Sequence, residues 1–444
     1  MTRKYFGTDG IRGTVGQEPL TAEFALRLAS AVARVLAPNG GRAVIGKDTR
    51  VSGYMFESAL EAGFVAAGMD VSLLGPLPTP GIAHLTHSMQ ADLGVVISAS
   101  HNPFDDNGIK FFDKDGRKLS DEIEMQIEAS LEQPAITRPS AELGSASRVD
   151  TARSQYQWFC METLPEGVDL QGLKIVLDCS HGAAYKVAPR VLSQLGADVV
   201  AIGCSPNGLN INKDCGSTHP ELLQATVKGV GADLGIALDG DGDRLLMVDH
   251  KGNLADGDQL LYLMANARHA RGELQGPVVG TLMTNLGLEK ALQEKGIEFL
   301  RANVGDRYVL EMLRERGGEL GGETSGHMLV LDKTTTGDGL ISALQVLGEV
   351  RLSGRPLSEL VEEMPQYPQT LVNVRTEDRI DLESPGIQAA VQQVEQQLGD
   401  RGRVVLRASG TEPVVRVMVE GQEEAEVVAL AEQLADAVRA AASG

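Results

Sequence analysis

The sequence has little cysteine, few aromatic residues and no long apolar run. Aromatic residues make up only 4% of the chain, so its cores must be aliphatic. The cysteines match no zinc or redox spacing and are too few for a disulfide scaffold; they are Cys160, Cys179, Cys204 and Cys215. No stretch of about 18 apolar residues occurs, so we expect no transmembrane helix. The first residues also contain no apolar core of the kind found in signal peptides, and these absences predict a cytoplasmic protein.

Basic residues are scarce relative to acidic ones. The chain has 40 Lys and Arg against 61 Asp and Glu, a net charge of −21. Nucleic acids and anionic membranes are bound through clusters of Lys and Arg, so the charge argues against either partner. It does not exclude a small anionic ligand, because a site can be basic within an acidic protein. Solubility is the simplest reason for the excess of acidic residues.

The first two-thirds of the chain alternates short apolar runs with helix-like stretches. The runs are rich in Val, Ile and Leu and are bounded by Gly, Asp or Ser, as buried strands are. They cover Ala43–Gly46, Leu93–Ser98, Lys174–Asp178, Asp198–Ile202, Leu234–Asp239 and Pro277–Thr281. The helix-like stretches include Thr21–Leu36, Gly53–Ala67 and Ser120–Glu132. This alternation predicts α/β domains with mixed or parallel sheets, whose ligands bind beyond the carboxyl ends of the strands.

Changes in composition indicate where domains meet. Residues 133–147 are rich in Pro, Ser and Ala, residues 249–257 are rich in turn formers, and residues 365–368 read PQYP. After that break, Leu371–Ala441 predicts strand, helix, strand, strand and helix, a small α+β domain. We therefore expect four domains. Their expected limits are 1–150, 151–253, 254–367 and 368–444.

The segment Ser98–Pro103 (SASHNP) directly follows an apolar run. A hydroxyl just beyond a buried strand can be exposed and firmly held, as Ser100 would be here. Serine alone is a weak nucleophile and needs an activating partner or a metal. These six residues taken alone fit a Ser-rich turn closed by Asn-Pro equally well.

Three carboxylates alternate with glycine after the run that begins at Leu234. Asp239, Asp241 and Asp243 can turn toward one point, and such a set suits a hard cation such as Mg²⁺. A calcium loop of the helix-loop-helix type needs Gly at its sixth position and Glu at its twelfth. Counted from Asp239, those positions hold Arg and His, so that reading fails. A solvated acidic turn is the other alternative, and the regular pattern after a strand disfavours it.

The glycine-rich segment Gly322–His327 (GETSGH) contains side chains that can bind sugar hydroxyls. Glu323, Ser325 and His327 supply the acceptors and donors. A polar turn without a ligand explains this segment alone equally well.

The segment Arg407–Pro413 (RASGTEP) combines hydroxyls, a glycine N–H and arginine, and is followed by a strand that carries Arg416. Arginine forks and backbone N–H groups match the geometry of phosphate. A hairpin turn is the alternative, but two arginines around Ser-Gly-Thr favour an anion site.

These four motifs, in this order, resemble the α-D-phosphohexomutase superfamily over nearly all 444 residues. The resemblance implies four domains around a central cleft: three related α/β domains with mixed sheets and a smaller C-terminal α+β domain. Three further segments are similar to the bacterial amino-sugar branch of the superfamily, together with Gly322–His327. They are Lys4–Gly13 (KYFGTDGIRG), Cys215–Pro220 (CGSTHP) and Lys333–Gly339 (KTTTGDG). One position departs from that branch, since Thr324 stands where Gln is common.

The resemblance implies an isomerase that moves a phosphoryl group through phosphoserine at Ser100. The phosphoserine would phosphorylate a sugar phosphate to a 1,6-bisphosphate and then recover the other phosphate. The net reaction would interconvert glucosamine 6-phosphate and glucosamine 1-phosphate, which leads toward UDP-N-acetylglucosamine. Glucosamine 1,6-bisphosphate, or glucose 1,6-bisphosphate, would be the primer.

The resemblance also implies roles for individual residues. Mg²⁺ would be held by Ser100, Asp239, Asp241 and Asp243. Acid–base chemistry would fall to Lys110, with Arg12 and His101 nearby. Glu323, Ser325 and His327 would bind the sugar, and the remaining phosphate would be held by Arg407, Ser409, Gly410, Thr411 and Arg416. Arg244 and Arg307 would face the cleft. To act as a base near neutrality, Lys110 would need a pKa well below its ordinary value of about 10.4.

Three other functions stay open at this point. A mutase of mannose or glucose phosphates would use the same motifs. A phosphatase would use the same serine and metal but release its phosphate, and a non-catalytic sensor of sugar phosphates would not need all three aspartates. The expected partner is in each case a small sugar phosphate, and the expected assembly is a monomer or a homodimer.

Overall fold

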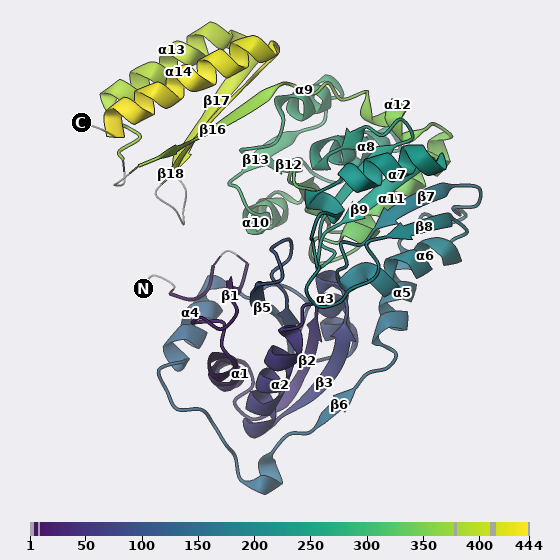
Figure 1. Ribbon diagram of the computed structural model, residues 1–444, viewed down its shortest axis with the longest axis vertical. Helices are drawn as coiled ribbons and strands as arrows, with labels where there is room; N and C mark the ends of the chain where they lie inside the picture. The colour runs from purple at the N-terminus through teal and green to yellow at the C-terminus, as the bar shows by residue number, and fades with distance from the viewer. Residues whose placement is uncertain (1–3, 8, 377–379, 409–413, 443–444) are drawn as a thin grey trace.

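The computed structural model describes residues 4–7, 9–376, 380–408 and 414–442. Within these ranges the strands form four sheets, which follow one another along the chain (Figure 1). The first three sheets mix parallel and antiparallel pairs, and the fourth is antiparallel. This confirms the predicted fold class of three α/β domains and a smaller α+β domain. The expected domain limits remain a prediction.

The first sheet has six strands in the order β1-β5-β4-β2-β3-β6. They are β1 (Ile11–Thr14), β2 (Gly41–Lys47), β3 (Met69–Pro76), β4 (Leu93–Ile97), β5 (Asp106–Asp113) and β6 (Ala146–Arg148). Its helices are α1 (Ala22–Leu36), α2 (Gly53–Ala66), α3 (Thr79–Ser88) and α4 (Asp121–Ser130). Both faces of β2 are apolar: Ala43 and Ile45 pack with α1 and α2, whereas Val44 packs with α3. Because successive side chains of a strand point to opposite faces, helices cover both sides of this sheet.

The second sheet has five strands in the order β11-β10-β9-β7-β8. They are β7 (Lys174–Asp178), β8 (Asp198–Ile202), β9 (Leu234–Leu238), β10 (Leu245–Asp249) and β11 (Leu254–Ala255). Its helices are α5 (Ala152–Glu162), α6 (Ala188–Gln194) and α7 (Glu221–Val230).

The third sheet has four strands in the order β13-β12-β14-β15. They are β12 (Val278–Thr281), β13 (Phe299–Ala302), β14 (Leu320–Gly322) and β15 (Met328–Val330). The helices are α8 (Gly257–Ala270), α9 (Leu286–Glu294), α10 (Asp306–Arg316), α11 (Gly339–Ser353) and α12 (Leu357–Val361). Short 3₁₀ turns elsewhere in the chain lie at Ser140–Glu142, Ala183–Lys186, Gly216–Thr218 and Gly399–Arg401.

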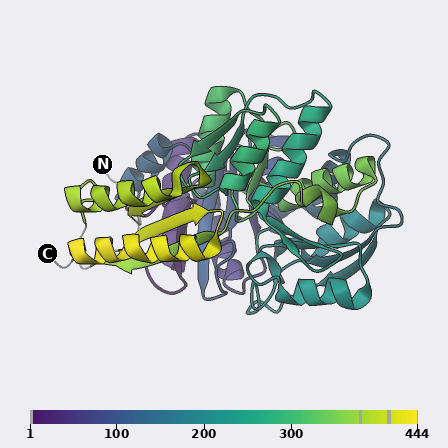
Figure 2. The ribbon, with the colours of Figure 1, turned by 90° about the horizontal axis from the view of Figure 1, so that it is seen from above.

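The fourth sheet has the order β16-β18-β17 and packs against two helices. Its elements are β16 (Gln369–Arg375), α13 (Pro385–Leu398), β17 (Gly402–Ala408), β18 (Val414–Gly421) and α14 (Glu424–Ala442), the order that the sequence predicts. Figures 1 and 2 show this unit at one end of the molecule. Its core is separate, whereas one apolar core runs through the first three domains. No helix in the described ranges is long and apolar enough to cross a membrane.

One correction concerns the segment expected to be a linker, residues 133–147. Its end forms β6, which pairs with β3 of the first sheet over Val71–Leu73. The segment is therefore not a free connection: the backbone N–H and C=O groups of β3 recruit it as an edge strand, an effect that composition does not reveal.

A buried hydrogen bond connects α5 to the start of α11. Tyr156 Oη donates to Asp338 Oδ2 at 2.7 Å, and Asp338 caps α11 by accepting from the N–H groups of Leu340 and Ile341. Gly339 N–H in turn donates to the carbonyl of Gly242, so the cap also supports the loop that follows β9.

Tyr156→Phe should lower the free energy of unfolding by about 2 kcal/mol at pH 8, because it leaves a buried carboxylate without its charge-assisted partner. Urea unfolding followed by circular dichroism measures the change. Tyr54→Phe is the matched control, since that ring is 63% exposed. Equal urea midpoints for the two variants would contradict the assigned role.

Candidate active site

Ser100 lies in a tight loop beyond the carboxyl end of β4, in a left-handed backbone conformation with φ 52°. Such a conformation is costly for a residue other than glycine, so surrounding groups must hold it. The fully buried Arg50 donates to the carbonyls of Ser100 and Asn102 at 3.1 and 2.8 Å. Asn212, from the second domain, donates to the same two carbonyls at 2.8 and 3.0 Å. The serine loop is therefore held from two domains.

The hydroxyl of Ser100 meets the acidic loop that follows β9. Its Oγ donates to Asp239 Oδ2 at 2.6 Å. The approach requires glycine at position 240, because a Cβ there would lie 2.6 Å from the carbonyl oxygen of Ser100. The structure thus brings together two groups that lie 139 residues apart in the chain.

The three aspartates form one buried cluster. Asp239, Asp241 and Asp243 are at most 6% exposed, and one oxygen of each lies within 4.8 Å of the others. Burial and the two neighbouring carboxylates raise the pKa of Asp239 well above its ordinary value. Oδ1 of Asp241 and Oδ1 of Asp243 are buried and make no hydrogen bond. Unpaired oxygens of this kind are the ligands that a hard divalent cation prefers, so the residues fit Mg²⁺.

Lys110, on β5, is held between two carboxylates. Its Nζ lies 2.9 Å from Asp241 Oδ2 and 2.8 Å from Asp9 Oδ2. Burial opposes the charged form, but Asp241 and Asp9 outweigh it and raise the pKa of Lys110 above its ordinary value. In this arrangement Lys110 is a cation, and its expected role in acid–base chemistry remains a prediction, because a divalent cation on Asp241 would lower the pKa of Lys110.

His101 is the neutral group beside the serine. Its Nδ1 lies 3.4 Å from Ser100 Oγ. Burial, with the nearby charges of Arg244 and Arg12, lowers the pKa of His101 to about 4. Arg12 forms an ion pair with Asp9.

The loop predicted to bind the sugar, Glu323–His327, is called the sugar-binding loop after that prediction; it connects β14 to β15 and lies against the acidic loop. The backbones of Arg244 and His327 form an isolated β-bridge. Glu323 Oε1 accepts from the N–H of Gly305 at 3.0 Å, and Ser325 Oγ is buried without a hydrogen-bond partner. An unpaired hydroxyl beside a carboxylate is suited to bind a polar ligand.

His327 pairs with carboxylates on both sides of its ring. Nδ1 lies 3.6 Å from Asp243 Oδ2, and Nε2 lies 3.3 Å from Asp306 Oδ2. Burial opposes the charged ring, but Asp243 and Asp306 raise the pKa of His327 to about 9. The side chain is thus an imidazolium at neutral pH.

Arg244 lies between the acidic loop and the sugar-binding loop. Its N–H donates to Asp239 Oδ1 at 3.1 Å. Burial opposes the charge of its guanidinium, but the carboxylates of Asp239, Asp243 and Glu323 raise its pKa.

Arg307, at the start of α10, forms ion pairs with Asp121 and Glu124 of α4 and with Glu311 of its own helix. It also lines a small pocket together with Lys110, Asp9 and Lys118. The expectation that it faces the cleft remains a prediction.

The predicted phosphate cradle is only partly described. Ser409, Gly410 and Thr411 lie outside the described residues. Arg407 and Arg416 are opposite each other on β17 and β18, and the Nε atom of each is buried without a hydrogen-bond partner. Burial and the charge of Arg416 lower the pKa of Arg407. Within the described ranges, no hydrogen bond or ion pair connects either arginine to the acidic cluster.

Sequence reasoning missed a set of alternating charges around the site. Lys118 Nζ lies 2.7 Å from Asp9 Oδ1 and 2.5 Å from Asp306 Oδ2. Together with the contacts above, this completes a chain of ion pairs, here called the charge ring. Its members in order are Asp241, Lys110, Asp9, Lys118, Asp306, His327 and Asp243. Asp9 lies within the quoted KYFGTDGIRG segment, which could have indicated it, but nothing local distinguishes Lys118 or Asp306.

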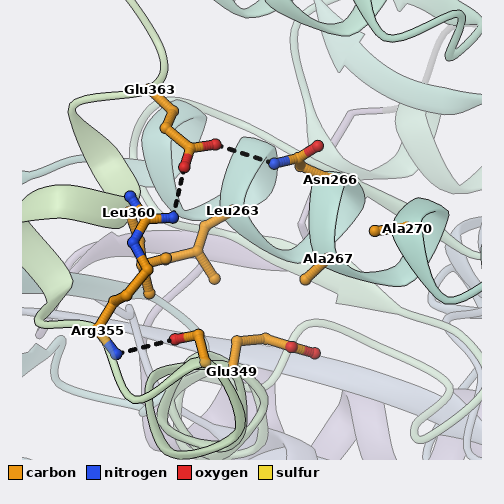
Figure 3. A pocket seen from close by; sticks show the side chains of 9 residues that line it. Leu263, Asn266, Ala267, Ala270, Glu349, Arg355, Leu360 and Glu363 are labelled. Atoms are coloured by element: carbon orange, nitrogen blue, oxygen red, sulfur yellow. Dashed lines mark hydrogen bonds and ion pairs between the residues drawn. The ribbon is translucent and has the colours of Figure 1, made fainter.

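A separate cavity of about 170 Å³ lies between α8, α11 and α12 (Figure 3). Leu263 and Leu360 line it, and Arg355 bonds to Glu363 at its edge. None of the predicted site residues is among its lining residues, so this cavity is distinct from the charged site.

Four family models match the chain in order. They describe phosphoglucomutase/phosphomannomutase domain I at residues 3–137, domain II at 160–252, domain III at 256–367 and the C-terminal domain at 371–437.

Curated relatives and solved structures agree with these matches. A phosphoglucosamine mutase of Methylococcus capsulatus is 58% identical over 446 residues and covers 100% of both chains. A crystal structure of a phosphoglucomutase/phosphomannomutase family protein from Burkholderia thailandensis has a TM-score of 0.82 at 26% identity and covers 98% of both chains. The N-acetylphosphoglucosamine mutase of Aspergillus fumigatus, solved with GlcNAc-6P and magnesium, shares the fold at 18% identity, with a TM-score of 0.72 over 99% of this chain and 96% of that one. The chain therefore belongs to the phosphoglucomutase/phosphomannomutase family, as its four motifs predicted.

Proposed function

We propose that the chain interconverts glucosamine 6-phosphate and glucosamine 1-phosphate through phosphoserine at Ser100 and a 1,6-bisphosphate. The observation that carries this proposal is the 2.6 Å contact between Ser100 Oγ and Asp239 within a buried cluster of three carboxylates. Full-length relatives at 58% identity are named phosphoglucosamine mutase, which supports the amino sugar over glucose or mannose.

Mg²⁺ would be held by Asp239, Asp241 and Asp243 together with an oxygen of Ser100 or its phosphate. When bound, the cation would neutralise negative charge on the transferred phosphoryl group. The two unpaired carboxylate oxygens support this assignment. The magnesium in the related Aspergillus structure agrees with it.

The protein groups around Ser100 suit phosphoryl transfer, which depends mainly on positioning and on charge stabilisation. The carbonyl contacts of Arg50 and Asn212 keep the serine loop in one conformation. Lys110 carries its proton beside Asp241 and would stabilise the oxygens of the moving group. Lys110 would exchange the hydroxyl proton, with Arg12 and His101 nearby, and Nδ1 of His101 lies 3.4 Å from Ser100 Oγ.

The rest of the substrate would be held by the sugar-binding loop and the phosphate cradle. Glu323 and Ser325 would bind the sugar hydroxyls, and the buried Nε atoms of Arg407 and Arg416 would bind the phosphate that does not react. Ser409, Gly410 and Thr411 would complete the cradle. Because the fourth domain has its own core, it could move as one body and close over the sugar, which would exclude water from the phosphoserine.

The direct test is a side-by-side assay with Mg²⁺ and a trace of glucose 1,6-bisphosphate. Glucosamine phosphates should turn over faster than glucose or mannose phosphates, without release of inorganic phosphate. Release of one phosphate for each substrate would identify a phosphatase instead.

Ser100→Ala should abolish covalent phosphorylation and lower kcat by at least about 10³-fold, since it removes the group that carries the phosphate. Intact-mass analysis after incubation with the bisphosphate measures the first effect. Ser154→Ala, on the exposed part of α5, is the control and should gain one phosphoryl group as the wild type does. A phosphorylated Ser100→Ala protein would rule out this residue as the carrier.

Asp241→Asn should weaken Mg²⁺ binding and lower kcat by about 10² to 10³-fold, because one anionic ligand is lost and Lys110 loses one of its two carboxylate partners. Isothermal titration with Mg²⁺ alone measures the binding separately from the activity. The matched control is Asp198→Asn, an exposed carboxylate on β8. Unchanged Mg²⁺ affinity would remove Asp241 from the metal site.

The charge of His327 should make the stability of the metal-free protein depend on pH. Because the pKa of His327 is raised on folding, its charged ring contributes fully to the free energy of unfolding below the ordinary pKa of about 6.5. That contribution is lost as the pH rises toward 9. The wild type should therefore lose about 3 kcal/mol relative to His327→Gln over this range. Urea unfolding of both proteins in chelator at several pH values measures the difference, and parallel pH profiles would contradict it.

A further inference from the structure

Asp258 is a buried carboxylate that has no part in the acidic cluster or the charge ring. It is the second residue of α8 and is 0% exposed. Its Oδ2 accepts two hydrogen bonds, from Thr324 Oγ1 at 2.7 Å and from Asn285 N–H at 2.8 Å. Its Oδ1 is buried without a hydrogen-bond partner in the described part of the chain. Burial and the charge of Asp256 raise the pKa of Asp258 to about 7.

A carboxylate in such surroundings costs free energy, because no cation compensates the loss of water. A gain in folding stability therefore does not explain why a carboxylate stands at position 258. The two groups that it joins are the predicted sugar-binding loop and the turn before α9, which contacts the fourth domain.

The first contact of Asp258 holds the sugar-binding loop. Gly257 N–H donates to the carbonyl of Thr324 at 3.1 Å, while the hydroxyl of Thr324 donates to Asp258. A Cβ on Gly257 would lie 2.1 Å from the carbonyl oxygen of Glu323. The first turn of α8 thus lies directly against the loop and binds Thr324 through both backbone and side chain.

The second contact of Asp258 is with the turn before α9, and the fourth domain also binds this turn. Asn285 caps α9, and the N–H of the next residue, Leu286, donates to Glu420 Oε1 at 2.9 Å. Glu420 Oε2 accepts from Arg403 Nε at 2.6 Å. Glu420 and Arg403 lie on β18 and β17, the two strands that also carry the arginines of the phosphate cradle.

We propose that Asp258 is a positioning residue that couples the sugar-binding loop to the fourth domain. The relay passes from Thr324 to Asp258, through Asn285 and Leu286, to Glu420. This inference rests on the proposed function. The sugar hydroxyls and the non-reacting phosphate must be held in one register while the other phosphate meets Ser100, and a small misplacement at a distance lowers the rate steeply. The relay keeps the sugar-binding loop and the phosphate cradle in the relative positions that this requires.

Thr324→Val tests the relay most directly, since it removes the hydroxyl and keeps the shape of the side chain. We expect kcat/KM for glucosamine 6-phosphate to fall about tenfold, with Mg²⁺ affinity close to that of the wild type. The thermal midpoint should fall as well, because a buried carboxylate loses a donor. Thr324→Ser restores the hydroxyl and should recover most of the loss. The matched control is Thr226→Val, whose hydroxyl bonds only within the exposed helix α7.

Asp258 itself offers a second, independent test. Asp258→Asn can place its one oxygen where Oδ2 accepts both hydrogen bonds, so it should stay within about threefold of wild-type kcat/KM. Asp258→Leu removes both bonds and should match or exceed the loss in Thr324→Val. Equal activity of the Asn and Leu variants would overturn the proposal.

A double-mutant cycle between Thr324→Val and Glu420→Leu examines the coupling, because Leu at position 420 removes the acceptor of the Leu286 N–H. The two side chains share no direct contact, so their effects on kcat/KM should multiply if they act independently. The proposal predicts a combined loss at least about threefold smaller than the product. If the two losses in kcat/KM simply multiply, this inference is overturned. It is also overturned, without harm to the proposed function, if the wild type is active and Thr324→Val is equally active. An inactive wild type would instead overturn the proposed function.

Discussion

The placement of three carboxylates in one buried cluster is the constraint on which the rest of the structure depends. Close negative charges in a dry site repel one another strongly, and each has lost its hydration. Protein cations therefore surround the cluster: Lys110 contacts Asp241, and His327 lies beside Asp243. Lys118 connects the further carboxylates Asp9 and Asp306 and so closes the charge ring. The ring draws on three domains, which explains why their loops must converge at one point.

The loops can meet at this cluster only if their backbones adopt particular conformations. The left-handed conformation of Ser100 would be disfavoured in an isolated loop, and it persists because Arg50 and Asn212 bind its carbonyl from two directions. The acidic loop can approach only because position 240 has no side chain. The hydroxyl of Ser100 is thus placed by two side chains that bind the backbone of its loop. One of them, Arg50, is a buried guanidinium whose donors all find oxygen acceptors.

The molecule divides into a large body and a smaller unit with different roles. The first three domains share an apolar core, so the serine loop, the acidic loop and the sugar-binding loop form one preorganised assembly. The fourth domain has a core of its own and contacts the third through polar groups around Asn285 and Glu420. Polar contacts of this kind suit a joint that changes its angle, and Asp258 connects that joint to the sugar-binding loop.

The sequence by itself determined the order of the elements, the fold class and the local motifs. Apolar runs bounded by Gly and Asp predicted β7 and β8 at their observed limits, because burial and turn chemistry are local properties. The motifs indicated Ser100, the three aspartates and the sugar-binding loop for the same reason. Edge pairing is not local, so the strand β6 was predicted to be a linker.

Only the tertiary structure decided which charges meet. Lys110 stays a predicted acid–base residue, and its pKa depends on Asp9 and Asp241, which lie more than 100 residues away along the chain. Arg307 lines a pocket with Lys110 and Asp9, and its ion pairs with the carboxylates of α4 could not be seen from the sequence. Lys118, Asp306 and Asp258 have no sequence signature, since their roles arise from contacts with residues far apart in the chain. The pKa and the hydrogen bonds of a side chain depend on which groups lie near it in space, and only the fold brings those groups together.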